Sequence, residues 1–220
     1  MRKFHFSSLA AGLLCGCMAV VCLTACDRSG SSSGGEDYSE SQLPYGATIV
    51  VDKNYPISIQ YDRRCLDEAL IAKVVDFYDA IQTQDAAKFK DVQLPLYHDY
   101  SLAQSYGGKY TDADILKLAF ETDLTDEDGN AYDFSLIDIT DAHRGTVYSD
   151  TATTLELLDK IAEEQGTSKI STSVDDAREM TIARYLTKQG SGERGETDNM
   201  LEEESILALH YNGEWVLIYN

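Results

Sequence analysis

Residues 205–219 read SILALHYNGEWVLIY. The Asn-Gly pair at 212–213 separates two apolar runs, and this dipeptide is the strongest short sequence signal for a β-hairpin. The stretch therefore predicts two antiparallel strands, residues 205–211 and 214–219, joined by a two-residue turn. Both strands are largely apolar, so other elements of the fold have to cover them.

The same turn predicts the register of the hairpin, with His210 opposite Trp215. Successive side chains of a strand point to opposite faces of the sheet. One face carries Ile206, Ala208, His210, Trp215, Leu217 and Tyr219, and the other carries Leu207, Leu209, Tyr211, Val216 and Ile218. Both faces are apolar, so we expect both to be covered, one by a long helix and the other by a further element or another molecule.

The candidate for that long helix is residues 66–84. Apolar side chains recur there at every third or fourth position, the spacing of one face of an α-helix. The stripe consists of Leu66, Leu70, Val74, Phe77 and Ile81, and Tyr78 widens it. This pattern predicts the main wall of the core.

Weaker patterns predict the remaining elements. Helices are expected at residues 85–92, 96–105, 111–122 and 150–165, and strands at 47–51, 56–61, 132–140 and 178–188. In the strand at 132–140, Tyr132, Phe134 and Leu136 are expected to share one face. Residues 178–188 also fit a helical spacing, but their alternation favours a strand.

This order of elements resembles the NTF2-like, cystatin-related α+β fold. The resemblance rests on the run FYDAIQTQDAAKF at 77–89 and on the terminal hairpin with its Gly-x-Trp at 213–215, and it covers residues 66–220. It implies N-terminal helices packed on a curved antiparallel sheet, with a conical pocket between them. The helix expected at 150–165 is an insertion in that pattern.

The resemblance also implies which side chains approach the pocket. The candidates are Phe77, Tyr78, His210 and Trp215, and the hairpin face with His210 and Trp215 is expected to be the inner one. The opposite face would then contact the inserted helix, a partner protein or a second copy in a homodimer. If uncovered, this face would be an exposed apolar patch of roughly a few hundred Å², which is unusual on a monomer.

The first 25 residues are typical of an export signal. Arg2 and Lys3 precede an uncharged run at 9–23, which is too short to favour a stable membrane span. The segment Leu-Thr-Ala-Cys at 23–26 resembles the bacterial lipobox. That resemblance implies a diacylglycerol on the sulfur of Cys26, cleavage just before it, and attachment to the outer face of the bacterial cytoplasmic membrane. Ordinary secretion with a free Cys26 is the alternative.

The segment after Cys26 is rich in Ser, Gly and acidic residues, with no apolar periodicity. Such a composition cannot bury enough surface to fold and indicates a flexible tether. The expected organisation is therefore a signal peptide at 1–25, a lipidated cysteine and tether at 26–42, and one α+β domain at 43–220.

The charge balance restricts the partners. The chain has 18 Lys and Arg against 38 Asp and Glu, a formal net charge of −20. Such a surface repels phosphate backbones, so nucleic acid is not expected as a partner. A solvated acidic surface that keeps the protein soluble is the simplest interpretation.

The sequence shows no strong metal or cofactor motif. The histidines at 98, 143 and 210 have no helical i, i+4 pairing, and Asp126, Asp128 and Gly129 match only part of a calcium loop. That loop pattern fails at its first position, Leu124, and at its last, Ser135. No cofactor and no metal site are therefore expected.

Catalytic motifs are equally weak. Cys65 is the single cysteine in the expected domain, and we expect it to pack as a small buried side chain near a helix start rather than act as a nucleophile. Asp76 and Asp79 are placed on or near the solvated side of the long helix, and no spacing ties an acid to a base. No catalytic residue is assigned.

Two functional hypotheses follow. The first is a non-catalytic module that binds an unknown small ligand or a protein partner. The alternative is an enzyme that acts on a small molecule in the conical pocket. An acid that meets a Tyr or His in a closed pocket would favour the enzyme, and a filled interior would favour the module.

Overall fold

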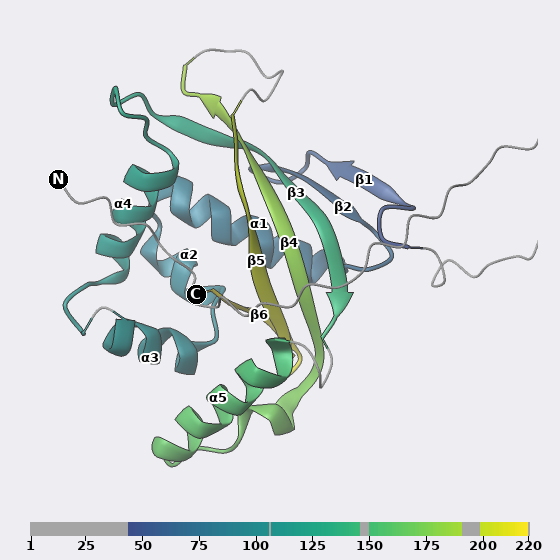
Figure 1. Cartoon of the computed structure of the whole chain (residues 1–220), viewed down its shortest axis with the longest axis vertical. Helices are drawn as coiled ribbons and strands as arrows, with labels where there is room; N and C mark the ends of the chain where they lie inside the picture. The colour runs from purple at the N-terminus through teal and green to yellow at the C-terminus, as the bar shows by residue number, and fades with distance from the viewer. Residues whose placement is uncertain (1–43, 106, 146–149, 191–198, 220) are drawn as a thin grey trace, which may run out of the picture. The chain divides into compact units, whose positions relative to one another are not determined.

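The computed structural model describes residues 44–105, 107–145, 150–190 and 199–219. The expected signal peptide, Cys26 and the tether lie outside the described residues. The described part is a mixed α+β fold with a six-stranded sheet and five α-helices (Figure 1). The α+β class expected from the sequence is therefore confirmed.

The strands lie in the sheet in chain order. They are β1 (Ile49–Asp52), β2 (Ser58–Asp62), β3 (Tyr132–Arg144), β4 (Val174–Lys188), β5 (Asn199–Tyr211) and β6 (Glu214–Ile218). All neighbours are antiparallel except β2 and β3, which run parallel. Parallel neighbours need a long crossover connection, and four helices lie in the chain between these two strands.

The helices confirm the sequence pattern. They are α1 (Glu68–Thr83), α2 (Ala86–Asp91), α3 (Pro95–Ser105), α4 (Asp112–Asp123) and α5 (Asp150–Glu164). The Asp67 carboxylate caps α1 by accepting from the Leu70 N–H at 2.8 Å, so this helix begins two residues later than its apolar stripe. The strand predicted at 178–188 is also confirmed.

The terminal hairpin has the predicted register, with His210 opposite Trp215. The strand β5 is longer than predicted, because it begins at Asn199 rather than at 205. Its extra residues pair with the far end of β4.

Helix α1 covers the inner face of this hairpin. Phe77 is fully buried. The centroid of its ring lies 5.2 Å from that of Tyr78, 5.7 Å from that of Phe89 and 4.9 Å from that of Tyr219. Aromatic side chains therefore fill the space between α1 and the sheet at this level.

The outer face of the hairpin is covered by the inserted helix. Leu158, Ile161 and Ala162 of α5 form a buried cluster with Leu209, Val216 and Ile218 of the hairpin, with Tyr97 of α3 and with Leu94, which precedes α3. Of the three occupants considered for this face, the structure shows α5.

One predicted face is wrong. Phe134 of β3 points inward, but register shifts at 134–136 and 139–141 move the inward positions to Ile137, Ile139 and Ala142. Each bulge adds one residue and reverses the alternation beyond it. Leu136 therefore does not share the inward face of Phe134.

The chain leaves β2 through a buried carboxylate. The Asp62 side chain accepts from the backbone N–H of Gly46 at 2.9 Å, from the Thr48 hydroxyl at 2.6 Å and from Arg64 Nη2 at 2.6 Å. These donors, Arg64 foremost, hold the pKa of Asp62 well below its ordinary value. The carboxylate ties the segment before β1 to the β2–α1 loop.

Replacing Phe77 by Ala tests the packing of α1. The change should lower the free energy of unfolding by about 3–5 kcal/mol, because it leaves a cavity under three rings. Denaturant unfolding measures this, with Leu118→Ala at a half-exposed position of α4 as the control, expected within about 0.5 kcal/mol of native. A loss under about 1 kcal/mol for Phe77→Ala would contradict the packing described.

Replacing Asp62 by Asn tests the buried carboxylate. At neutral pH the variant should lose about 3–5 kcal/mol, because the buried Arg64 guanidinium loses the negative charge of Asp62. The depressed pKa gives native protein a stabilisation that is fully present above about pH 5 and is lost progressively as the pH falls below that. The stability gap between native protein and variant should therefore narrow from about pH 5 to about pH 2.5. Asp91→Asn, at an exposed position of α2, should show no such narrowing.

Candidate functional site

Two hollows flank the loop that connects β2 to α1. The first has a volume of about 180 Å³ and is lined by Arg63, Arg64, Cys65, Leu66, Asp67, Arg178 and Trp215. The second has a volume of about 620 Å³ and is lined by Val50, Val51, Asp52, Asn54, Tyr61, Arg63, Leu66, Asp67 and Glu68. Arg63, Leu66 and Asp67 line both hollows, and together we name the two hollows the loop cleft.

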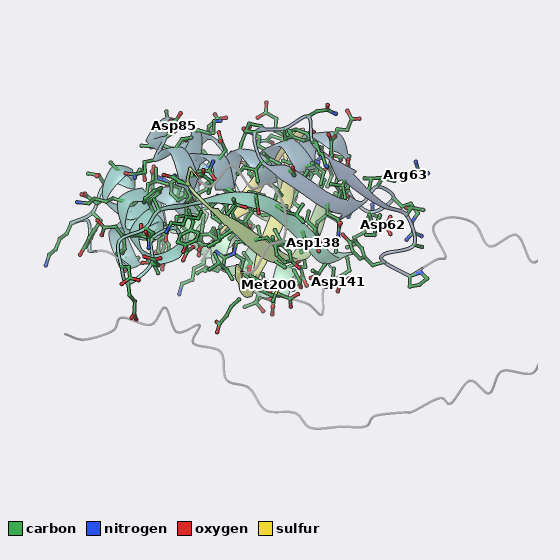
Figure 2. All side chains as sticks on the ribbon, turned by 90° about the horizontal axis from the view of Figure 1, so that it is seen from above. Asp62, Arg63, Asp85, Asp138, Asp141 and Met200 are labelled. Carbon is green, nitrogen blue, oxygen red and sulfur yellow. The ribbon has the colours of Figure 1, made fainter. Side chains whose placement is uncertain are left out.

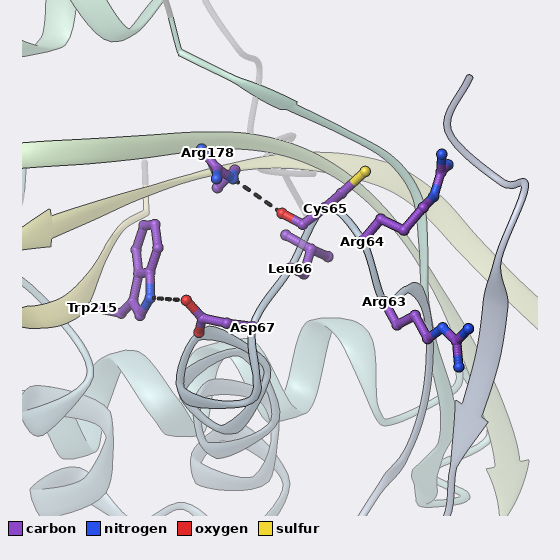
Figure 3. Close-up of a pocket in the computed structure, with 7 residues that line it drawn as sticks. All are labelled: Arg63, Arg64, Cys65, Leu66, Asp67, Arg178 and Trp215. Carbon is purple, nitrogen blue, oxygen red and sulfur yellow. Dashed lines mark hydrogen bonds between the residues drawn. The ribbon is translucent and has the colours of Figure 1, made fainter. Parts of the chain in front are cut away.

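Asp67, the N-cap of α1, also binds the indole of Trp215 in the loop cleft. One oxygen of Asp67 caps the helix, and the other accepts from Trp215 Nε1 at 3.0 Å (Figure 3). The His210 ring lies 5.0 Å from the Trp215 ring, and its Nδ1 lies 2.5 Å from an oxygen of Asp175. The structure thus brings His210 and Trp215 together and places Trp215 in the first hollow.

The cationic groups of the cleft have structural partners. Arg64 binds Asp62, while Arg178 donates from Nε to the Cys65 carbonyl at 3.1 Å and from Nη1 to Asp176 at 2.5 Å. Figure 3 shows the side chains of Arg63 and Arg64 reaching away from Trp215. These arginines organise the loop.

The thiol of Cys65 is half-buried in the first hollow. Burial raises the pKa of this thiol above its ordinary value, and the negative charge of Asp62 acts in the same direction. A raised pKa keeps the sulfur protonated, whereas a nucleophilic cysteine needs a lowered one. The geometry agrees with a packing role.

Phe77 and Tyr78 lie elsewhere, in the interior between α1 and the sheet. The Tyr78 hydroxyl donates to Glu204 Oε1 at 2.5 Å. Arg184 Nε lies 3.3 Å from that same oxygen, and Arg184 Nη1 donates to Asp123 at 3.0 Å. We name Tyr78, Asp123, Arg184 and Glu204 the interior polar cluster. This cluster was not predicted from the sequence.

Burial dominates the electrostatics of this cluster. It raises the pKa of Glu204 and that of Asp123 above their ordinary values, although the charge of Arg184 opposes both shifts. Burial also raises the pKa of Tyr78, and the charge of Glu204 adds to that shift. Burial therefore disfavours the charged forms of Glu204, Asp123 and Tyr78. The polar groups of the cluster bind one another instead of water.

Asp79 corrects a further expectation from the sequence. It was placed near the solvated side of α1, but it is buried and binds Lys88 Nζ at 2.6 Å. Lys88 belongs to α2, which packs against α1 and supplies the counter-ion. Asp76 lies beside the same ammonium group at 3.5 Å and is more exposed.

Within residues 44–105, 107–145, 150–190 and 199–219, no group of three or more His, Cys, Asp or Glu side chains is placed to hold a metal ion. None of the helices in these ranges has the length and apolar character needed to cross a membrane. No known protein family, curated protein or solved structure matches the chain. Its function therefore has to be argued from its own residues.

Replacing Tyr78 by Phe tests the interior polar cluster. The change removes one hydroxyl and leaves a buried carboxyl without its donor, so the free energy of unfolding should fall by about 1–3 kcal/mol. Tyr132→Phe is the matched control, because that hydroxyl donates to the carboxylate of Asp126 in a surface loop. Equal losses in both variants would contradict a buried Tyr78–Glu204 bond.

Proposed function

We propose that this protein is a lipid-anchored module on the outer face of a bacterial cytoplasmic membrane. Its NTF2-like domain binds a ligand or protein partner in the loop cleft without catalysing a reaction. The open cleft beside the start of α1 is the observation that carries the binding function. The anchor rests on the lipobox-like ending of the export signal at Cys26.

The arrangement of α1 on the sheet supports an NTF2-like domain. The first long helix packs against one face of a sheet whose strands β3 to β6 are antiparallel, and register shifts bend β3 and β4. The helix α5 and the parallel pairing of β2 with β3 are this chain's own additions to that pattern.

The interior supports binding rather than catalysis. In the enzyme hypothesis an acid and a tyrosine meet in a closed pocket, and Glu204 and Tyr78 do meet. Their polar atoms, however, bind each other and Arg184, and the rings around Phe77 occupy the neighbouring space. A general acid needs to reach a substrate, and this pair is enclosed by its own partners.

The cleft offers exposed surface instead. Tyr61 and Leu66 provide apolar contact, and Arg63 and Glu68 provide charge at its rim. Sites with an apolar floor and a few polar groups are typical of ligand recognition.

Metabolic labelling with a radioactive fatty acid tests the anchor. Native protein should carry the label and sediment with membranes, and Cys26→Ser should lose both properties, because two or more acyl chains on one cysteine are needed for firm attachment. Cys22→Ser, four residues earlier in the leader, is the control and should be labelled like native protein. A Cys26→Ser variant that remained labelled would overturn the lipoprotein assignment.

A further inference from the structure

The strand β1 ends the sheet with a free edge. Among the described residues its sheet neighbour is β2 alone. The Arg63 N–H donates to the Thr48 carbonyl at 3.3 Å, and the backbone groups of an antiparallel strand alternate in direction. The N–H and C=O groups of Ile49 and Val51 therefore point away from β2.

Within the four residues of β1 the described structure has no Lys, Pro or bulge. Edge strands are commonly blunted by Lys, Pro or a bulge. Residues 49–51 are Ile-Val-Val, and the side chains of Ile49 and Val51 are 42 % and 48 % exposed. A free edge with exposed β-branched side chains is suited to accept another strand.

The larger hollow of the loop cleft lies along the same strand. Val50, Val51 and Asp52 of β1 line it together with Tyr61 of β2 and Glu68 of α1. Carboxylates at 52, 67 and 68 border it, against the single cation Arg63.

The electrostatic effect of these acids is visible at the neighbouring tyrosines. Burial raises the pKa of Tyr61, and the charges of Asp52 and Glu68 add to the shift. Tyr55 is affected in the same way, with burial first and Asp52 next. Both carboxylates thus act on one spot beside β1.

We propose that β1 binds an extended basic peptide segment of a partner protein, which adds to the sheet as a seventh strand and places a lysine or arginine between Asp52 and Glu68. This inference rests on the proposed binding function of the loop cleft and names its partner class. Main-chain hydrogen bonds to Ile49 and Val51 supply affinity, and the acidic groove supplies specificity.

The charge of the chain favours this occupant over a second copy. A second copy would bring its own Asp52 and Glu68 to the edge, and each chain carries a formal net charge of −20. Like charges across an interface oppose association, whereas a basic segment is attracted and steered. A basic peptide meets both the free backbone groups and the acids.

Two synthetic peptides test the proposal on the full-length lipoprotein in detergent. One alternates valine and lysine, and the other alternates valine and glutamate, each with a fluorescent label for anisotropy titration. The lysine peptide should bind at least about tenfold more tightly at low salt, and the difference should shrink as salt screens the charges.

Val51→Pro tests the strand edge. Proline removes an N–H that points away from β2, so the β1–β2 ladder remains while the added strand loses a donor. Binding of the lysine peptide should weaken by up to about tenfold, the upper end of one hydrogen bond's net contribution. Val51→Thr is the matched control. It keeps the N–H and a β-branched side chain, so it should bind the lysine peptide as tightly as native protein does. Circular dichroism and thermal unfolding establish that both variants fold.

Glu68→Lys tests the charge. It should weaken binding of the lysine peptide and strengthen binding of the glutamate peptide. Asp91→Lys makes the same change in net charge on α2, at a carboxylate that is 83 % exposed and distant from β1 in sequence. The Asp91→Lys variant should still bind the lysine peptide more tightly than the glutamate peptide.

Three results would overturn the proposal. They are equal binding of the two peptides, no binding of either, and binding by Val51→Pro equal to that of native protein. Light scattering adds a fourth, which is self-association that Val51→Pro abolishes, because the occupant would then be a second copy. Fatty-acid labelling at Cys26 is read separately, so failure of the peptide experiment leaves the anchor intact, and loss of the anchor leaves the peptide result standing.

Discussion

The burial of both faces of the β5–β6 hairpin is the constraint on which the rest of the structure depends. An isolated two-stranded hairpin is marginally stable in water. Each large apolar side chain that leaves water contributes about 1.5–3 kcal/mol. The hairpin carries such side chains on both faces, so one covering layer is not enough. Helix α1 supplies the inner layer, and α5 with α3 supplies the outer one. The inserted helix is therefore part of the core.

The loop cleft forms where the chain passes from the sheet to α1, the helix that covers the inner face of the hairpin. Strand β2 pairs with β3 in parallel, so the chain has to leave the sheet after β2 and return by a long path. It leaves through residues 63–67 and enters α1, whose cap Asp67 binds Trp215 on β6. Figure 2 places Arg63 and Asp85 at opposite ends of the α1 layer, with Asp138 and Asp141 on the far side of the sheet. The loop cleft is thus an open depression between strands β1 and β2 and the start of α1.

The features that sequence could predict are those encoded by neighbouring residues. The Asn-Gly turn determined the hairpin register, and the spacing of apolar residues located α1 and α5. The bulges in β3 could not be predicted, because one added residue leaves each local pattern intact while reversing the face beyond it. Burial of Asp79 was missed because its partner Lys88 lies on another helix. Arg184 and Glu204 did carry a signal, since each lies two residues from a buried isoleucine on the same strand, Ile182 and Ile206. Charged residues in phase with an inward face indicate a paired buried cluster.

The exterior is acidic because the chain has 38 acidic residues against 18 basic ones. Arg64, Arg178 and Arg184 each bind a carboxylate that is buried or half-buried, respectively Asp62, Asp176 and Asp123. Buried carboxylates require such partners, because desolvation of an unpaired charge is costly. Each such pair removes one cation and one anion from the surface, so the excess of acids remains there. The external field therefore attracts positive groups over a distance of about one Debye length, roughly 8–10 Å at moderate salt. At β1 that field coincides with exposed apolar side chains and free backbone groups, so the same place can attract a basic segment, hold it by main-chain hydrogen bonds and bury part of its apolar surface.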